Sequence, residues 1–408
     1  MRSLLARCIL PVLAVVASWV LLSILGDNVA TTSAAAARDR GRSAGFPLEL
    51  VSAQLSPDGM IAAVDGPAEH GMWRISLVDV RSGRLVTTSP EGWFSIRHRW
   101  GAGTAYVETR GSPSNVWSIY YAPFARSPVT RVEIPHVSSR VIQPSETALD
   151  PHNRWLIVAA HFRDFVRVLA VSLPSARRVT TLWESKEYVE ILGVTAVPGA
   201  GDETLVLLGG FTEGPGNRPG VLAVSCPTGS SLSRVRWRVR IPEWPVFFGQ
   251  MGVVDSSKAI LPARTGGVQD MQAGAKPKSV VWLIDLRKGS LDGLAILPTW
   301  RADWAAGIPR KRRDGVLIGT DDGIWLLPVR AGVGPGVPIV REAVQCWPAG
   351  VTEAPTGGVE LYLATRNCLW RCLLRDRTVK AVYGTPQKED QAPQIVASDA
   401  MLESAGLR

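Results

Sequence analysis

A four-strand unit recurs along most of the chain, and it constrains the fold more than any other feature of the sequence. Its first copy reads VSAQLSPDGMIAAVDG and then MWRISLVDVRSGRLVTTS, between Val51 and Ser89. Two apolar runs flank the turn Ser56–Gly59, where Pro presets φ and Gly accepts a positive φ. Two more runs flank a second turn at Arg81–Gly83. We therefore expect each unit to form one antiparallel sheet.

A second clear copy of the unit lies between Ser145 and Glu184, with Asp150–Asn153 in place of the first turn. Weaker copies fill the rest of the chain. The turns between first and second strands are then expected near Asp58, Ala102, His152, Gly201, Ser256, Arg312 and Thr356, with a spacing of 44 to 56 residues. This spacing accommodates one four-stranded sheet per repeat.

Repetition of one four-stranded sheet predicts an all-β, seven-bladed β-propeller over residues 48–386. Six or eight blades are the alternatives for the ring, and a pair of β-sandwiches is the alternative fold. Sandwiches have similar short strands but do not predict recurrence of one unit. Either Phe46–Val51 or Gln394–Ala397 is expected to complete a terminal blade, and residues 387–408 form a C-terminal tail.

The segments LSPDGMIAAVDG and ISLVDVRSGRL resemble the repeats of TolB-type and related periplasmic, WD-like propellers. The segment IGTDDGIW at 318–325 is similar to a signature of sensor-type propeller repeats. The resemblance is one of repeat style, and it implies the fold and a cell-envelope setting. It implies no partner, because the TolB-type protein has an additional N-terminal α/β domain.

The N-terminus carries an export signal. Arg2 and Arg7 precede 19 apolar residues, Cys8–Gly26, which at about 1.5 Å per residue nearly span a bilayer as a single hydrophobic helix. We expect residues 1–37 to be a signal anchor, or a signal peptide cleaved near Ala34–Ala37, followed by a linker at 38–47. The body is then an extracytoplasmic domain of the cell envelope, anchored by one span or released as a secreted or periplasmic protein.

The net charge of +9 does not indicate nucleic-acid binding. Arg310–Arg313 is the one dense basic run in the sequence, and the other basic residues are scattered, many of them alternating with apolar residues. We interpret the run as a solvated turn and expect no nucleic-acid partner.

The sequence provides no catalytic residue, cofactor motif or metal motif that we can assign. It has no C-x-x-C-H haem motif, no phosphate-binding loop in a strand-to-helix setting, and no pair of His at metal-ligand spacing. A metal site would have to be assembled across blades, for example from His161 with Asp164 or from Glu69 with His70. Such a site would support the alternative function, a propeller enzyme of the lactonase-like hydrolase or lyase type.

Tryptophan is the remaining unusual feature, with 15 residues. Four of them, at 93, 244, 304 and 347, fall at the entry to a predicted inner strand, and two charged residues adjoin one of them. Large aromatic residues there either pack blade against blade or form a binding funnel. The predicted binding residues are Trp93, Trp244, Arg301, Asp303, Trp304 and Trp347.

These features favour a non-catalytic propeller that binds a protein partner or ligand as a scaffold in the cell envelope. Its partners would be a protein or envelope complex and, through the N-terminal helix, the membrane. The metal-dependent propeller enzyme is the second hypothesis.

Overall fold

The computed structural model describes a large part of the chain between residues 52 and 408. The described residues are 52–56, 58–67, 73–88, 97–101, 104–109, 117–122, 130–134, 147–161, 165–173, 177–186, 188–199, 202–212, 220–226, 233–241, 245–248, 251–255, 257–265, 278–299, 302–308, 315–329, 335–341, 347–386 and 392–408. All of them belong to one compact unit, Glu49–Arg408. The predicted signal anchor at 1–37 and the linker at 38–47 lie outside them. Among the described residues, no helix is long and apolar enough to cross a membrane.

The described strands form seven antiparallel sheets, which we number along the chain. Sheet 1 contains β1 (Ser52–Leu55), β2 (Ile61–Pro67), β3 (Trp73–Asp79) and β4 (Leu85–Thr88), and sheet 2 contains β5 (Arg97–Gly101), β6 (Thr104–Thr109), β7 (Trp117–Ala122) and β8 (Thr130–Ile134). Sheet 3 contains β9 (Thr147–Leu149), β10 (Trp155–His161), β11 (Val166–Ser172) and β12 (Val179–Ser185), and sheet 4 contains β13 (Tyr188–Pro198), β14 (Thr204–Thr212), β15 (Gly220–Cys226) and β16 (Val235–Arg240).

The remaining three sheets contain the C-terminal half of the unit. Sheet 5 contains β17 (Pro245–Phe248), β18 (Gly252–Asp255), β19 (Lys258–Thr265), β20 (Lys278–Asp285) and β21 (Ser290–Leu297). Sheet 6 contains β22 (Ala302–Gly307), β23 (Gly315–Thr320), β24 (Gly323–Pro328), β25 (Val337–Arg341) and β30 (Gln394–Ile395), and sheet 7 contains β26 (Trp347–Glu353), β27 (Val359–Ala364), β28 (Cys368–Leu373) and β29 (Thr378–Gly384).

Six predicted turns lie between the first two strands of their sheets, and the turn near Ser256 lies between β18 and β19 of sheet 5. In sheet 1 the Ser56 carbonyl accepts from the Gly59 N–H, and in sheet 3 the Asp150 carbonyl accepts from the Asn153 N–H. Gly59 and Asn153 both have positive φ, +70° and +57°, which is why Gly or Asn is needed there. Local turn chemistry therefore defines the repeat.

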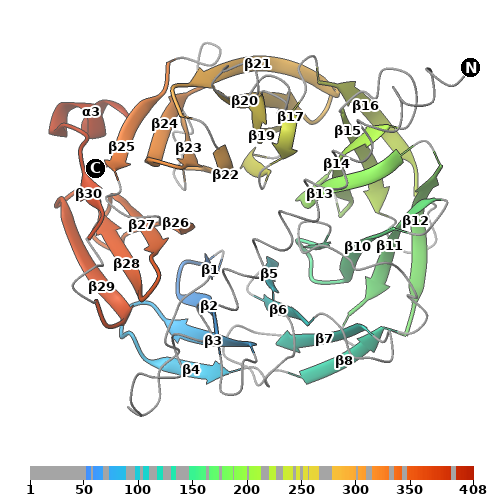
Figure 1. Ribbon diagram of the computed structural model, residues 1–408, viewed down its shortest axis with the longest axis horizontal. Coiled ribbons are helices and arrows are strands. Elements are labelled where there is room, and N and C mark those ends of the chain that lie inside the picture. Colours follow the sequence, from blue (N-terminus) through green and yellow to red (C-terminus); the bar gives the residue numbers. More distant parts are fainter. Residues whose placement is uncertain are drawn as a thin grey trace, which may run out of the picture. The chain divides into compact units, whose positions relative to one another are not determined.

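The sheets are arranged side by side around a centre, with their first strands innermost (Figure 1). First strands of consecutive sheets contact one another around the ring, except that β18 of sheet 5 contacts β22 of sheet 6, and β26 of sheet 7 in turn contacts β1 of sheet 1. Core clusters lie between sheets 3 and 4, 4 and 5, 5 and 6, 6 and 7, and 7 and 1, so sheets 4 to 7 bury both faces against their neighbours. The strands are accordingly apolar on both faces, as in the fully buried β15.

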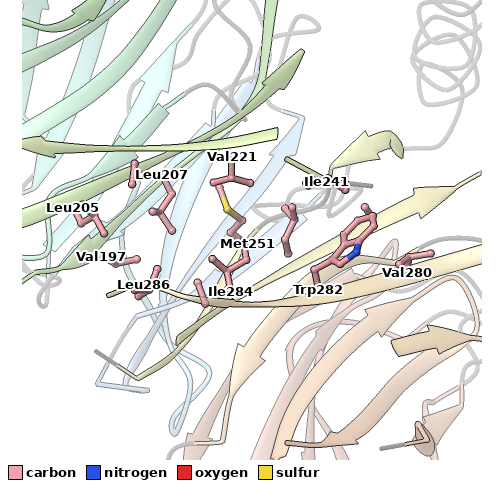
Figure 2. Packing of buried hydrophobic residues seen from close by; sticks show 14 residues of the cluster. Val197, Leu205, Leu207, Val221, Ile241, Met251, Val280, Trp282, Ile284 and Leu286 are labelled. Carbon is pink, nitrogen blue, oxygen red and sulfur yellow. The ribbon is translucent and has the colours of Figure 1, made fainter. Parts of the chain in front are cut away.

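The core between sheets 4 and 5 illustrates this packing (Figure 2). Leu207 and Val221 of sheet 4 pack with Leu261, Trp282 and Ile284 of sheet 5 in one buried cluster. Trp282 is 1% exposed, and its indole N–H has no hydrogen-bond partner. Its contribution to stability is therefore apolar contact rather than hydrogen bonding.

Sheets 1 and 7 meet through side chains, and they share no strand in the part of the chain that the structure describes. Ala53, Val64 and Val78 of sheet 1 pack with Tyr362 and Tyr383 of sheet 7. Beside this cluster, the buried Glu360 accepts a hydrogen bond from the Tyr362 hydroxyl at 2.8 Å and pairs with Arg371 at 2.5 Å. Arg371 therefore neutralises the buried Glu360 carboxylate close to the junction between the first and last sheets.

The C-terminal segment returns to sheet 6 after sheet 7 is complete. Its strand β30 pairs with β25, so Gln394–Ile395 extends the sixth sheet rather than a terminal one. Helix α3 (Asp399–Ser404) follows, and Leu402 and Leu407 are fully buried between sheets 6 and 7. The other predicted closing strand, Phe46–Val51, lies outside the described residues.

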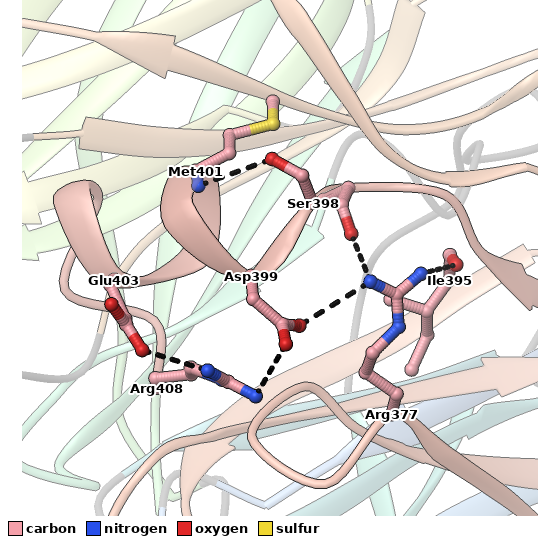
Figure 3. A network of polar contacts seen from close by, with 8 residues as sticks. Arg377, Ile395, Ser398, Asp399, Met401, Glu403 and Arg408 are labelled. Carbon is pink, nitrogen blue, oxygen red and sulfur yellow. Dashed lines mark hydrogen bonds and ion pairs between the residues drawn. The ribbon is translucent and has the colours of Figure 1, made fainter.

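Polar contacts hold this segment in place (Figure 3). The Arg377 guanidinium donates to the carbonyls of Ile395 and Ala397, and it pairs with Asp399 at 3.4 Å. Asp399 also pairs with Arg408 at 3.0 Å. Arg377 of sheet 7 therefore holds the C-terminal segment in place, and strand β30 of that segment covers the outer edge of sheet 6.

Candidate functional site

The structure places three of the six predicted binding residues on neighbouring first strands. Asp303 and Trp304 lie in β22, and Trp347 begins β26, which contacts β22. All three lie near the end of the sheets at which first strands begin, which we call the mouth. Trp93, Trp244 and Arg301 lie outside the described residues.

Strand register shows that Trp304 and Trp347 occupy equivalent positions. Trp304 pairs with Gly319, the residue before Thr320, and Trp347 pairs with Ala364, the residue before Thr365. In both sheets another Trp follows that Thr by the same interval, at Trp325 and Trp370. The predicted equivalence of the two positions is thus confirmed by pairing in sheets 6 and 7.

In sheets 6 and 7 the Thr and the following Trp take part in hydrogen bonds at the link between the second and third strands. In sheet 6 the Thr320 hydroxyl and the Trp325 indole N–H both donate to Asp322, each at 2.7 Å. In sheet 7 the Trp370 indole N–H donates to Thr365 at 3.0 Å. These bonds fix the link between second and third strands beside the candidate residues.

Trp304 is half-buried and packs against the core cluster between sheets 6 and 7. Part of the Trp304 indole therefore stabilises the packing between sheets 6 and 7, as the alternative of blade-against-blade packing predicts. The rest of the side chain is accessible, and an accessible aromatic face can contact a partner. Both uses of the residue are compatible with its position.

Asp303 occupies a β-bulge. Ala302 pairs with Thr320 and Trp304 with Gly319, which leaves Asp303 as the extra residue. Val246 is the extra residue at the same register in sheet 5, and Val189 in sheet 4. Bulges re-aim side chains next to functional sites, and here a carboxylate stands where the other two sheets have valine.

Sequence reasoning missed other residues at this register. Five sheets carry Thr at the end of the second strand, and the residue before it pairs with the candidate position of the first strand. Besides the two Trp, these pairs are Arg97 with Glu108, Glu190 with Phe211 and Phe247 with Arg264. The recurring Thr, at 109, 212, 265, 320 and 365, is the signal that would have found them.

The described residues include no cluster of His, Cys, Asp or Glu that could hold a metal ion. His161 is the last residue of β10, whereas Asp164, Glu69 and His70 lie outside the described part of the chain. Burial, with a smaller contribution from Asp150, raises the pKa of the Cys226 thiol to about 12. That cysteine is therefore a core residue and not a nucleophile.

Gly319 allows the two Trp-bearing strands to approach. A Cβ there would lie 2.5 Å from Pro348 Cγ and 3.2 Å from Trp304 Cβ. We expect Gly319→Ala to lower the free energy of unfolding by about 1–3 kcal/mol, because Pro348 of β26 must move away from Gly319 of β23. Urea denaturation measures this, and a stability equal to that of the unchanged chain would contradict the close packing.

Comparison with known proteins concerns the fold. A Kuenenia stuttgartiensis hydrazine synthase superposes with a TM-score of 0.52 at 14% identity, covering 85% of this chain and 98% of that one. The Dos1 propeller superposes with a TM-score of 0.50 at 10% identity, covering 86% of this chain and 91% of that one. The fold is that of a β-propeller.

TolB from Acinetobacter baumannii aligns at 14% identity with a TM-score of 0.40, over 67% of this chain and 64% of that one. No protein-family model matches the sequence, and no curated protein matches it significantly. At these identities the propeller fold is shared, and an activity is not implied.

Proposed function

We propose that this chain is a seven-bladed, non-catalytic β-propeller that binds a protein partner or ligand at its mouth, as a scaffold in the cell envelope. The seven sheets and the contact between the first and last of them support the blade number. The predicted signal anchor at 1–37 supports a membrane-tethered, extracytoplasmic body.

One observation carries the proposal. Equivalent aromatic residues, Trp304 and Trp347, stand on adjacent first strands, and Asp303 occupies the bulge beside one of them. Aromatic residues dominate binding hot spots, and a nearby charge adds specificity. Trp93, Trp244 and Arg301 are the further residues proposed for this surface.

Affinity capture from membranes tests the proposal. The tagged full chain is extracted with non-ionic detergent, and captured proteins are compared for the unchanged chain, Asp303→Ala and Trp347→Ala. We expect capture to fall at least about tenfold for both variants, as for loss of a hot spot, with little change in melting temperature. His152→Ala is the matched control, because this exposed residue lies at the opposite end of the sheets.

Two outcomes would overturn the proposal. If Asp303→Ala and Trp347→Ala leave capture unchanged, the mouth is not the binding site. Stoichiometric calcium or zinc in the purified chain, lost on His161→Ala, would favour the enzyme hypothesis instead. Recovery of the chain in the cytosolic fraction would contradict the envelope location separately.

A further inference from the structure

The outer strand of sheet 4 has an unusual charge. β16 reads VRWRVR, with Arg236, Arg238 and Arg240 and no acidic residue. The outer strands of the other sheets carry at most one basic residue each, in β4, β8, β12, β21, β25 and β29. A basic strand is therefore a property of sheet 4 and not of the repeat.

The arginines of β16 are exposed on a strand that the core holds rigidly. Trp237 packs against the cluster between sheets 4 and 5, and its indole N–H donates to the Leu286 carbonyl at 2.8 Å, while Val239 is buried. Arg236, Arg238 and Arg240 are exposed, and Val235 is 52% exposed. Arg236 pairs with Glu203 at 2.5 Å, and β16 itself contains no acidic residue.

The molecule shows what can bind to such an edge. In sheet 6, β30 pairs with Val340 and Arg341 of the outer strand β25, just past a bulge at Ile339. The Ile339 carbonyl also accepts hydrogen bonds from the Val396 and Ala397 N–H groups. An outer strand of this propeller therefore accepts a fifth strand.

β16 also carries a bulge. It falls at Arg236, so Trp237 and Arg238 follow the bulge as Val340 and Arg341 do in β25. In the described part of the chain, sheet 4 ends at β16, and no strand pairs with its outer edge. The backbone edge of a strand with no neighbour is a template for strand addition.

We propose that the outer edge of β16 binds an extended, acidic segment of a partner protein as a fifth strand of sheet 4. Backbone hydrogen bonds to the stretch past the bulge would supply affinity. Side chains at every second position recur at roughly 7 Å along a strand, so alternating carboxylates would face Arg238 and Arg240. A second copy of β16 does not fit this edge, because its arginines would repel.

Model peptides in solution test the proposal without the partner. The probes are a short peptide alternating Glu and Val, the same peptide with Lys for Glu, and the Glu peptide N-methylated along one edge. Binding to the full chain in non-ionic detergent is followed by fluorescence anisotropy. We expect the Lys peptide to bind at least about tenfold more weakly and the N-methylated peptide to lose binding.

Variants and hydrogen exchange locate the site. Arg238→Glu with Arg240→Glu should weaken binding of the Glu peptide about tenfold, whereas Arg341→Glu, on the edge that β30 covers, should not. Bound peptide should slow exchange of the amides at 237–240 and not at 378–384 in β29. The proposal would be overturned if the N-methylated peptide bound as tightly as the Glu peptide, or if the Glu peptide protected amides other than those at 237–240. Neither result depends on whether the mouth binds a partner.

Discussion

Deletion of residues 392–408 is expected to leave the chain largely unfolded or aggregated at physiological temperature. The deletion removes Leu402 and Leu407, both fully buried between sheets 6 and 7, and uncovers the edge of β25. Two such leucines account for about 6 kcal/mol, which is comparable with the whole stability of many proteins. Soluble yield and thermal unfolding of the truncated chain measure the effect.

Point variants separate apolar packing from the polar contacts of the same segment. Leu402→Ala should lower the free energy of unfolding by about 3 kcal/mol. Arg377→Ala should have a much smaller effect, because its ion pair with Asp399 is exposed to solvent. A truncated chain that unfolds at the same temperature as the full chain would show that the segment does not stabilise the propeller.

Arg371→Ala is the second substitution with a large expected effect. It leaves the Glu360 carboxylate, whose side chain is 4% exposed, without its cation. Breaking a buried pair costs about 3–5 kcal/mol, and we expect about 2–4 kcal/mol here because Arg371 is 30% exposed and screened. Urea denaturation near neutral pH gives the value.

A double variant is the control for this prediction. Glu360→Leu with Arg371→Met replaces the pair by apolar groups of similar volume, and its stability should lie much closer to that of the unchanged chain. If the double variant were as unstable as Arg371→Ala, loss of packing and not an unpaired charge would be the cause.

Tyr362 adds a pH dependence at the same place. Burial, reinforced by its hydrogen bond to Glu360, raises the pKa of the Tyr362 hydroxyl above its ordinary value. The unfolded chain therefore ionises first, at about pH 10, and stability should fall as the pH rises further. Tyr362→Phe should reduce this fall, and part should remain because burial also raises the pKa of Tyr383.

The four-strand repeat and its turns were predictable because their determinants are local. The residues of Ser56–Gly59 and Asp150–Asn153 set backbone angles within a few positions, whatever surrounds them. The position of Trp304 and Trp347 at the entry to first strands was predictable for the same reason, since each precedes the predicted turn of its repeat by eight or nine residues. Phe247 and Arg264 were missed because their register depends on a bulge.

The arrangement of the C-terminal segment was not predictable. Helix α3 has a local signal in its N-cap, where Ser398 accepts from the Met401 N–H, but it is too short to be recognised by its periodicity. Gln394–Ile395 was expected to complete a terminal blade, and it pairs instead with β25, more than 50 residues earlier. A strand of two residues pairs wherever packing places it.

The sequence by itself therefore determined the repeating unit, its turns and the apolar character of its strands, because each depends on neighbours in the chain. Only the tertiary structure decided which sheets share a core, where the C-terminal segment binds and which outer edge is left uncovered. These depend on contacts between residues far apart in sequence, such as Tyr362 against Val64 and Leu402 between sheets 6 and 7. Apolar burial is non-directional, so it does not encode its partners in a local pattern.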